Sequence, residues 1–321
     1  MKNTRTNNFI SCPEEPLSPL LRIDKTIISS LSTITPWRSS LALAADWLMI
    51  IGAAVLCTLY FSVPLYLLTV LFIGGRFHGL AAMMHEASHY RLFHNRKLND
   101  WVGEALCALP LLLFTLHSYR SNHFRHHQYL NTLKDPDFTR KEHDLYFDHP
   151  KTRSAIYLDL LKTITGLHFI SDLITISRSK ILNDIPATLK WARRGFFLTL
   201  LTSSLAFGFF DKLLLYWVVP LMTSFSLFMY LRSVSEHHGG TMVYDNVLTG
   251  SRHINANFLE TICIPHNLNY HLDHHLYPSI PYYNLPTLHK ELLSRPNYVS
   301  NAHITDGYFK GLFRECLKDT I

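Results

Sequence analysis

Three short clusters of histidine stand out in this sequence, because imidazole is the commonest metal ligand in proteins. Their patterns are H-x-x-x-H, H-x-x-H-H and H-x-x-H-H, and their members are His85, His89, His123, His126, His127, His271, His274 and His275. Residues four apart share one face of a helix, so the outer histidines of each cluster can bind one ion. Adjacent histidines point about 100° apart, so one H-x-x-H-H cluster can serve two neighbouring ions. The spacing therefore predicts a site for two metals.

The abundance of histidine does not by itself account for these clusters. The chain has 20 histidines in 321 residues. At that frequency, about 0.08 H-x-x-H-H patterns are expected by chance in the whole chain. The sequence contains two of them, so an accidental origin is a poor explanation.

His237 is a ninth candidate ligand, because it follows the last long apolar stretch in the segment Ser233-Val-Ser-Glu-His-His238. The alternative is a surface histidine that benefits from the dipole of a helix end. Nine imidazoles would give each of two ions four or five nitrogen ligands and leave a position open for oxygen or water. One zinc takes four ligands, or three plus water, so nine are excessive for it. Imidazole also suits iron, copper and nickel, and we favour iron, since copper more often recruits Cys or Met.

The first cluster also matches H-E-x-x-H, the motif of zinc metalloproteases in which the glutamate is the general base. Such a protease needs a third, usually acidic, ligand downstream and has no use for two H-x-x-H-H clusters. An intramembrane zinc protease is therefore the weaker interpretation, and Glu86 is better explained as an acceptor that orients a ligand imidazole. Three further residues beside or within the clusters are candidates for the same role: Glu236, Asp273 and Asn269.

The other histidines are expected to lie outside the ligand set. We expect solvated side chains at four positions in polar stretches, namely His143, His149, His253 and His303. Five more lie near the clusters but out of register, namely His78, His94, His117, His266 and His289. We expect one or two of these five to support a ligand.

The charge balance and the cysteines narrow the class of protein. The net charge is +6 with histidine neutral, and the basic residues lie mainly outside the apolar stretches, which favours an anionic membrane surface as partner over nucleic acid. The sequence has no stripe of Lys and Arg with interleaved aromatics, so no nucleic-acid partner is expected. The five cysteines are widely spaced and form no C-x-x-C pair. They indicate neither a disulfide framework nor a zinc knuckle, and they fit a reducing compartment.

Two long apolar stretches must position the clusters. Residues 41–84 are mostly apolar with a break at 62–64, and they divide into two segments of about 20 residues, each long enough to span a bilayer. Residues 196–210 and 213–231 form a second pair with a turn at Asp211 and Lys212. The sequence therefore predicts an all-α integral membrane protein with four transmembrane helices in two hairpins.

The positions of Lys and Arg predict the orientation of these hairpins. Lys212 is the only basic residue in the two outer turns, whereas the opposite ends of the hairpins carry Arg22, Lys25, Arg38, Arg91, Arg96, Lys97, Arg193, Arg194 and Arg232. Since Lys and Arg favour the cytoplasmic side of spanning helices, the polar regions 85–192 and 232–321 share that side. We expect the metal site and both termini to be cytoplasmic, with the site held by a helical cap.

Two intermediate segments are apolar without being clear spans. Residues 102–116 are short and contain Glu104 and Pro110, which favours a re-entrant or interfacial segment over a buried helix. Residues 156–176 mix apolar and charged positions, which suits a helix lying flat at the lipid headgroups.

The ends of the chain complete the expected organisation. Residues 1–39 are a polar tail followed by an interfacial helix, whose apolar positions recur at helical spacing and could equally pack on the protein. Residues 40–295 form the catalytic domain, and residues 296–321 form a C-terminal tail.

With these clusters the chain resembles the membrane fatty acid desaturase and hydroxylase superfamily, whose members carry three histidine boxes on a four-helix membrane scaffold. The likeness extends to Met84–Asn95, Tyr119, Arg120, Asp135-Pro-Asp137 and Asn269–Pro278, and it covers about residues 40–295. By this resemblance, the ligands of two irons would be His85, His89, His123, His126, His127, His237, His271, His274 and His275.

The resemblance implies that molecular oxygen, activated at the two irons, removes hydrogen from a methylene of an acyl lipid held in an apolar tunnel. Two electrons per turnover would come from a separate ferredoxin, cytochrome b5 or reductase. Desaturases, hydroxylases, ketolases and oxidative decarboxylases share these boxes, and the segment Asn269–Pro278 favours a desaturase of a fatty acyl chain. The second box lacks the His-Arg opening common in acyl-CoA desaturases, which puts an acyl-CoA substrate in doubt.

A metal carrier or sensor without catalysis is a hypothesis of a different class. A transporter would be expected to place histidines or carboxylates within its spanning helices. Here the clusters lie beyond the predicted helix ends, which favours an enzyme.

Overall fold

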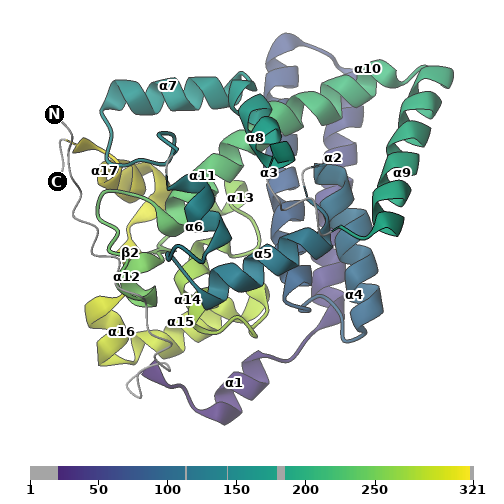
Figure 1. The fold of residues 1–321 in the computed structure, drawn as a ribbon. Helices are drawn as coiled ribbons and strands as arrows, with labels where there is room; N and C mark the ends of the chain where they lie inside the picture. Colours follow the sequence, from purple (N-terminus) through teal and green to yellow (C-terminus); the bar gives the residue numbers. More distant parts are fainter. Residues whose placement is uncertain (1–20, 113, 143, 179–184, 319–321) are drawn as a thin grey trace.

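Two long apolar helices form a hairpin in the computed structural model, which describes residues 21–112, 114–142, 144–178 and 185–318 (Figure 1). Helix α2 spans Pro36–Leu59 and helix α3 spans Val63–Ser88. Each has proline in its first turn, where the missing N–H costs nothing, and the Ser62 side chain caps α3. The hairpin expected from residues 41–84 is therefore present, with its break where the sequence places it.

Helix α3 is the central helix of the fold. Every residue from Ile73 to Ser88 is buried, and a Cβ on Gly79 would lie 2.6 Å from the carboxylate of Asp46 on α2. Glycine at that position therefore allows the two helices to approach closely. The last turn of α3 carries His85, and His89 ends the helix, so the first histidine cluster sits on a rigid, buried support.

A second long helical run, Phe210–His237, packs against α3. It consists of α10 (Phe210–Leu213), the π-helical segments η5 (Leu214–Val218) and η6 (Leu221–Phe225), and α11 (Ser226–His237). The wider π turns flank Pro220, whose ring cannot join a regular α-helical ladder. The run ends at Glu236 and His237, which places both beside the other clusters.

Three helices among the described residues are long and apolar enough to cross a membrane, namely Pro36–Leu59, Val63–Ser88 and Phe210–His237. The observed helix at the first arm of the second hairpin differs from the predicted arm at residues 196–210. Helix α9 (Ala187–Ala206) begins nine residues before the predicted arm and includes the charges of Lys190, Arg193 and Arg194. The turn that follows lies at 207–209 instead of at Asp211 and Lys212, which belong to α10.

A fourth span would exist if one bent helix pair crosses the membrane. The segments α4 (Arg96–Val102), η2 (Gly103–Ala108) and η3 (Leu109–Leu111) lead through a bend of 94° into α5 (Leu116–Gln128). Such a bend is either a broken span or a re-entrant loop. A re-entrant loop is one of the two arrangements expected for residues 102–116. Thr115 and Ser118 form a capping box that starts α5, which then carries the whole second cluster.

The sequence predicts one flat helix over residues 156–176, and the structure has two. Helix α7 spans Arg153–Ile164 and α8 spans Leu167–Arg178, because Gly166 between them has a φ of +79°, which ends a helix. Both helices expose large apolar side chains, including Leu158, Leu161, Leu167, Ile170 and Leu173. An apolar surface of this extent suits contact with lipid.

The remaining elements are short. They are α1 (Lys25–Leu31), α6 (Pro136–Lys141), α12 (Val247–Gly250), β1 (His253–Ile254), α13 (Phe258–Cys263), η7 (Leu268–Tyr270), α14 (His271–Leu276), η8 (Tyr282–Asn284), α15 (Leu285–Leu293), α16 (Pro296–Asn301), β2 (Ile304–Thr305), η9 (Gly307–Leu312) and α17 (Phe313–Glu315). Strands β1 and β2 pair in parallel, with His253 opposite Ile304. This sheet of two strands, each two residues long, is a small departure from the all-α prediction.

The segment that contains α1 packs on the protein near the third cluster. The hydroxyl of Tyr277 donates to the carbonyl of Leu21 at 3.0 Å and accepts from the Ile23 amide at 3.1 Å. Of the two alternatives for this helix, packing on the protein is therefore observed. The predicted tail at residues 1–19 lies outside the described residues.

The expected C-terminal tail, residues 296–321, is folded as far as residue 318. Tyr298 is fully buried, and the Glu315 carboxylate accepts from Arg252 and His303 at 2.9 Å each. Short segments of low periodicity give no sign in the sequence of the distant partners that hold them.

Candidate metal centre

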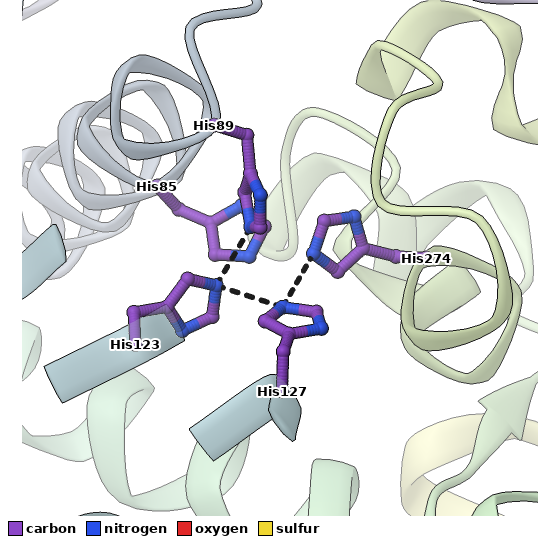
Figure 2. A group of neighbouring side chains, drawn as sticks. All are labelled: His85, His89, His123, His127 and His274. Carbon is purple, nitrogen blue, oxygen red and sulfur yellow. Dashed lines mark hydrogen bonds between the residues drawn. The ribbon is translucent and has the colours of Figure 1, made fainter. Parts of the chain in front are cut away.

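The nine predicted ligands come together in two adjacent groups of imidazoles. In each group, one nitrogen from every ring lies within 4.8 Å of the others. Group A consists of His85, His89, His123, His127 and His274 (Figure 2). Group B consists of His126, His237, His271 and His275.

The division of the nine histidines between groups A and B follows the helical spacing that the sequence predicts. On α5, His123 and His127 belong to group A, whereas His126 points to group B. On α14 the outer pair, His271 and His275, belongs to group B, and His274 belongs to group A. Two H-x-x-H-H helices that face each other therefore contribute to both groups, and His237 at the end of α11 completes group B.

The ring nitrogens approach one another as ligands of one ion would. In group A, His123 Nε2 lies 2.8 Å from His89 Nε2 and 3.0 Å from His127 Nε2, which lies 3.2 Å from His274 Nε2. Figure 2 shows these four rings and His85 converging from α3, α5 and α14. Two nitrogens bound at about 2.1 Å and about 90° apart would be about 3.0 Å from each other.

Group B has the same spacing. His237 Nε2 lies 3.1 Å from His126 Nε2 and 2.8 Å from His271 Nε2, which lies 3.0 Å from His275 Nε2. The donor set of both groups is therefore one that a metal ion fits.

Two further observations fit bound metal. His85 Nε2 is buried without a hydrogen-bond partner among the described residues, as expected of an atom whose partner is an ion. Burial lowers the pKa of His89 to about 3 and that of His271, His274 and His275 well below the usual value. These imidazoles are therefore neutral, with a lone pair available to a metal.

A linked pair of acceptors orients two predicted ligands of group B, His126 and His237. His126 Nδ1 lies 2.9 Å from the Asp135 carboxylate, and His237 Nδ1 lies 3.0 Å from the carbonyl of Gly250. Asn131 joins them, because its backbone N–H donates to Asp135 at 3.0 Å and its side-chain amide donates to the Gly250 carbonyl at 2.7 Å. Such contacts fix the tautomer and direction of a ligand imidazole.

Two of the predicted orienting residues lie beside ligands. Glu86 Oε1 is 3.4 Å from His85 Nδ1, and Glu236 Oε1 is 3.3 Å from His271 Nδ1. Arg232 donates to the same oxygen of Glu236 at 2.6 Å, so this carboxylate is held between a cation and an imidazole.

The other two, Asn269 and Asp273, form hydrogen bonds with residues outside groups A and B. Asn269 donates to the Ile254 carbonyl at 2.9 Å. The Asp273 carboxylate lies with His253 and His289 in a third buried group. The expectation that His253 is solvated is wrong, since its exposed fraction is 2%, and His149 is also buried.

A cavity of about 220 Å³ borders both metal groups through His123, His126 and His271. Part of its wall is apolar, with Ala81, Met84, Leu111, Phe225 and Met229. Elsewhere the wall carries ionic groups, including Asp137, Arg140, His168 and Asp172. A molecule with an apolar part and a polar part fits this lining.

The fold and the site together define a membrane protein with two adjacent groups of histidines that could each hold a metal ion. Residues 61–305 match the family model described as Fatty acid desaturase. The chain belongs to this family and is an oxidoreductase of the desaturase type.

Three relatives show the range of the family. A dihydrorhizobitoxine desaturase from Bradyrhizobium elkanii is 32% identical over 90% of this chain and 85% of its own length. An sn-1 oleoyl-lipid 12-desaturase from Arthrospira platensis is 27% identical over 70% of this chain and 68% of its own. A zeaxanthin 4-ketolase from Chlamydomonas reinhardtii is 26% identical over 65% of this chain and 40% of its own.

The sequence left three residues of the site without a role. Asp135 belongs to an Asp-Pro-Asp motif in the sequence, and its position nine residues after His126 is the available signal. Asn131 and Gly250 gave none, because the Gly250 carbonyl reaches His237 only through the folding of the segment after α11.

Proposed function

We propose that this chain is an oxygen-dependent desaturase that uses two iron ions to introduce a double bond into a fatty acyl chain. The observation that carries the proposal is the pair of imidazole groups, A and B, on the wall of one cavity. The five histidines of group A would hold one iron and the four of group B the other. A group with four imidazoles leaves more room for oxygen or water.

When bound, the irons supply the activation of oxygen that removal of hydrogen from an unactivated methylene requires. In balance, the acyl chain loses two hydrogens, and one O₂ with two electrons and two protons becomes two waters. The residues of the chain aim the ligand imidazoles through contacts with their Nδ1 atoms. Asp135 and the Gly250 carbonyl do this for His126 and His237, and Glu86 and Glu236 would do it for His85 and His271.

The cavity would position the substrate. The apolar side chains of Ala81, Met84 and Phe225 line it together with the ligands, so a methylene segment would lie against them. A polar head group would lie toward Arg140 and Asp172. Positioning of this kind supplies much of the rate, and a displacement of about 1 Å at the reacting carbon can cost about 100-fold.

An acyl-lipid substrate is supported by the relatives named as oleoyl-lipid 12-desaturases. The alternative is a hydroxylase or oxidative decarboxylase of a fatty acid or other lipid, and the relative named as a ketolase shows that the family includes another outcome. Because one relative is named for dihydrorhizobitoxine, a product search should include polar metabolites as well as lipids.

We also propose four transmembrane helices in two hairpins, with the metal site and both termini in the cytoplasm beneath a helical cap. The basic residues at one end of the hairpins, such as Arg38, Arg91 and Arg193, support this orientation. The second hairpin would combine α9 with Phe210–His237.

A separate ferredoxin, cytochrome b5 or reductase would deliver the two electrons. His127 and His275, one from each group, are only partly buried, and Phe124, one turn before His127 on α5, is 44% exposed. This part of the surface gives a donor a short path to both irons.

Expression in a lipid-accumulating host, followed by mass spectrometry of lipid and polar extracts, tests the reaction. The wild type should give a product lighter by two hydrogens, which should vanish in His271→Ala and persist in the control His94→Ala, whose exposed side chain lies outside both groups. A product with added oxygen would establish a hydroxylase. Unchanged extracts from well-expressed wild type would contradict the proposal and favour a metal-binding protein without this activity.

A further inference from the structure

Helix α14 holds three of the nine proposed ligands but is only six residues long. A helix this short has little stability of its own. Its rotation must therefore be fixed by tertiary contacts, because a small rotation would swing His271, His274 and His275 away from both groups at once.

The opposite face of α14 supplies the contact. At 100° per residue, the three histidines project within an arc of about 100°, and Asp273 projects about 150° from the centre of that arc. Asp273 has no exposed surface. Its carboxylate accepts from His253 Nδ1 at 3.0 Å, from His289 Nδ1 at 3.2 Å and from the Tyr298 hydroxyl at 2.7 Å.

These three donors come from three different elements, β1, α15 and α16. Two further hydrogen bonds tie the same region to the β1 segment, since Leu272 N donates to the Arg252 carbonyl at 3.1 Å and Asn269 donates to the Ile254 carbonyl. The carboxylate is thus the common acceptor through which separate parts of the chain hold one side of α14.

We propose that Asp273, held by His253, His289 and Tyr298, is a positioning residue that sets the rotation of α14 and so the direction of its three iron ligands. This inference rests on the proposed function. It also gives the segment after residue 295 a role in the metal centre, because Tyr298 belongs to that segment.

A third metal ion in this group is the competing explanation, since His253, Asp273 and His289 each offer a ligand atom. The contacts favour hydrogen bonding. Each joins an N–H or O–H donor to a carboxylate oxygen, and the rings of His253 and His289 stack at 3.8 Å with 10° between their planes. A carboxylate with three donors is satisfied without a metal.

The test is the rate at which iron leaves the purified full-length protein for a chelator. Asp273→Asn should lose iron about 10-fold faster than the wild type, the low end of the effects seen when partners of ligands are removed. Tyr298→Phe, which deletes one hydroxyl and is the safer variant for folding, should lose it about threefold faster. Both should change the Mössbauer spectrum of bound ⁵⁷Fe.

Glu315→Gln is the matched control, because it removes a carboxylate that joins separate elements without touching α14. It should lower the thermal midpoint but leave the rate of iron loss within twofold of the wild type. If Asp273 only stabilised the fold, Asp273→Asn and Tyr298→Phe would likewise lower the thermal midpoint and leave the rate of iron loss within twofold of the wild type.

Unchanged iron loss and an unchanged spectrum in both Asp273→Asn and Tyr298→Phe would overturn the proposal. So would a third metal per wild-type chain that disappears in His253→Gln. A wild type that binds no iron would instead overturn the proposed function, and the same comparison with added Co²⁺, followed by its absorption spectrum, would still decide the role of Asp273.

Discussion

Asn131 donates its side-chain amide to the carbonyl of Gly250 at 2.7 Å, and this one bond joins the supports of two proposed iron ligands. The Gly250 carbonyl faces His237, while the backbone of Asn131 donates to the carboxylate that faces His126. His126 and His237, two of the four proposed ligands of group B, are therefore oriented as a unit.

Asn131→Gly should weaken metal binding in group B. Glycine keeps the backbone N–H and tolerates the φ of +57° found at Asn131, so the change removes the amide alone. We expect about 10-fold weaker retention of the second iron, the low end of the effect for partners of ligands. Iron per chain is measured after dialysis, with the exposed Asn301→Ala as control, and equal retention in both variants would contradict the role.

Asp46→Ala should strongly destabilise the membrane hairpin. Asp46 is 1% exposed on α2 and accepts from Arg76 on α3 at 3.2 Å and from His266 at 2.7 Å. Removing one partner of a buried ion pair costs about 3–5 kcal/mol. Thermal unfolding in detergent should show this loss, and the double change Asp46→Leu with Arg76→Leu should be milder. A double variant less stable than Asp46→Ala would refute the argument.

Ala81→Leu should block the substrate without removing iron. Ala81 lines the cavity one turn before His85 and is 2% exposed, so a larger side chain must project into the space beside the ligands. We expect product formation to fall by at least about 10-fold, with iron per chain unchanged. Ala44→Leu, on the exposed face of α2, is the control. Full activity in Ala81→Leu would mean that the substrate lies elsewhere.

The stability contributed by Glu315 should depend on pH. Burial alone would raise the pKa of this carboxyl, but hydrogen bonds from His303, Thr305 and Thr241 and the charge of Arg252 lower it to about 2. Since the folded-state pKa lies below the unfolded value of about 4.3, the contribution is complete above that value and is lost as pH falls toward 2.

Glu315→Gln should therefore cost about 2 kcal/mol at pH 7, after allowance for solvent screening of a partly exposed carboxyl, and about half of that at pH 3. The measurement compares thermal midpoints of iron-free wild type and variant at the two pH values, so that acid release of metal does not intervene. A difference between the two proteins that stays the same at both values would show that the charge of Glu315 is not what stabilises this region.

The first hairpin and the division of the histidines could be predicted, because both follow from local periodicity. Residues 41–84 are long and apolar enough to specify two spans by themselves, and the i, i+3, i+4 spacing fixes which imidazoles share a face. His126 and His127 therefore point to different groups, as expected from their positions alone.

Asp273 could be predicted as a residue that supports the site, but its hydrogen-bond partners and the packing of the segment after residue 295 could not. Asp273 lies between two ligands in sequence, yet it projects to the opposite face of a short helix, and its partners His253 and Tyr298 are 20 and 25 residues away. Contacts of this kind depend on tertiary packing and leave no periodic signal in the chain. The charges of Asp211 and Lys212 predict a turn at these two residues. In the structure both belong to the helix α10, and the turn lies just before it.

The metal content of the purified wild type tests the central claim most directly. Elemental analysis of protein from iron-supplemented cells should find two irons per chain, and His237→Ala, which removes a ligand of group B alone, should hold about one. A wild type that contains zinc in place of iron, or that never exceeds one iron per chain, would contradict the account.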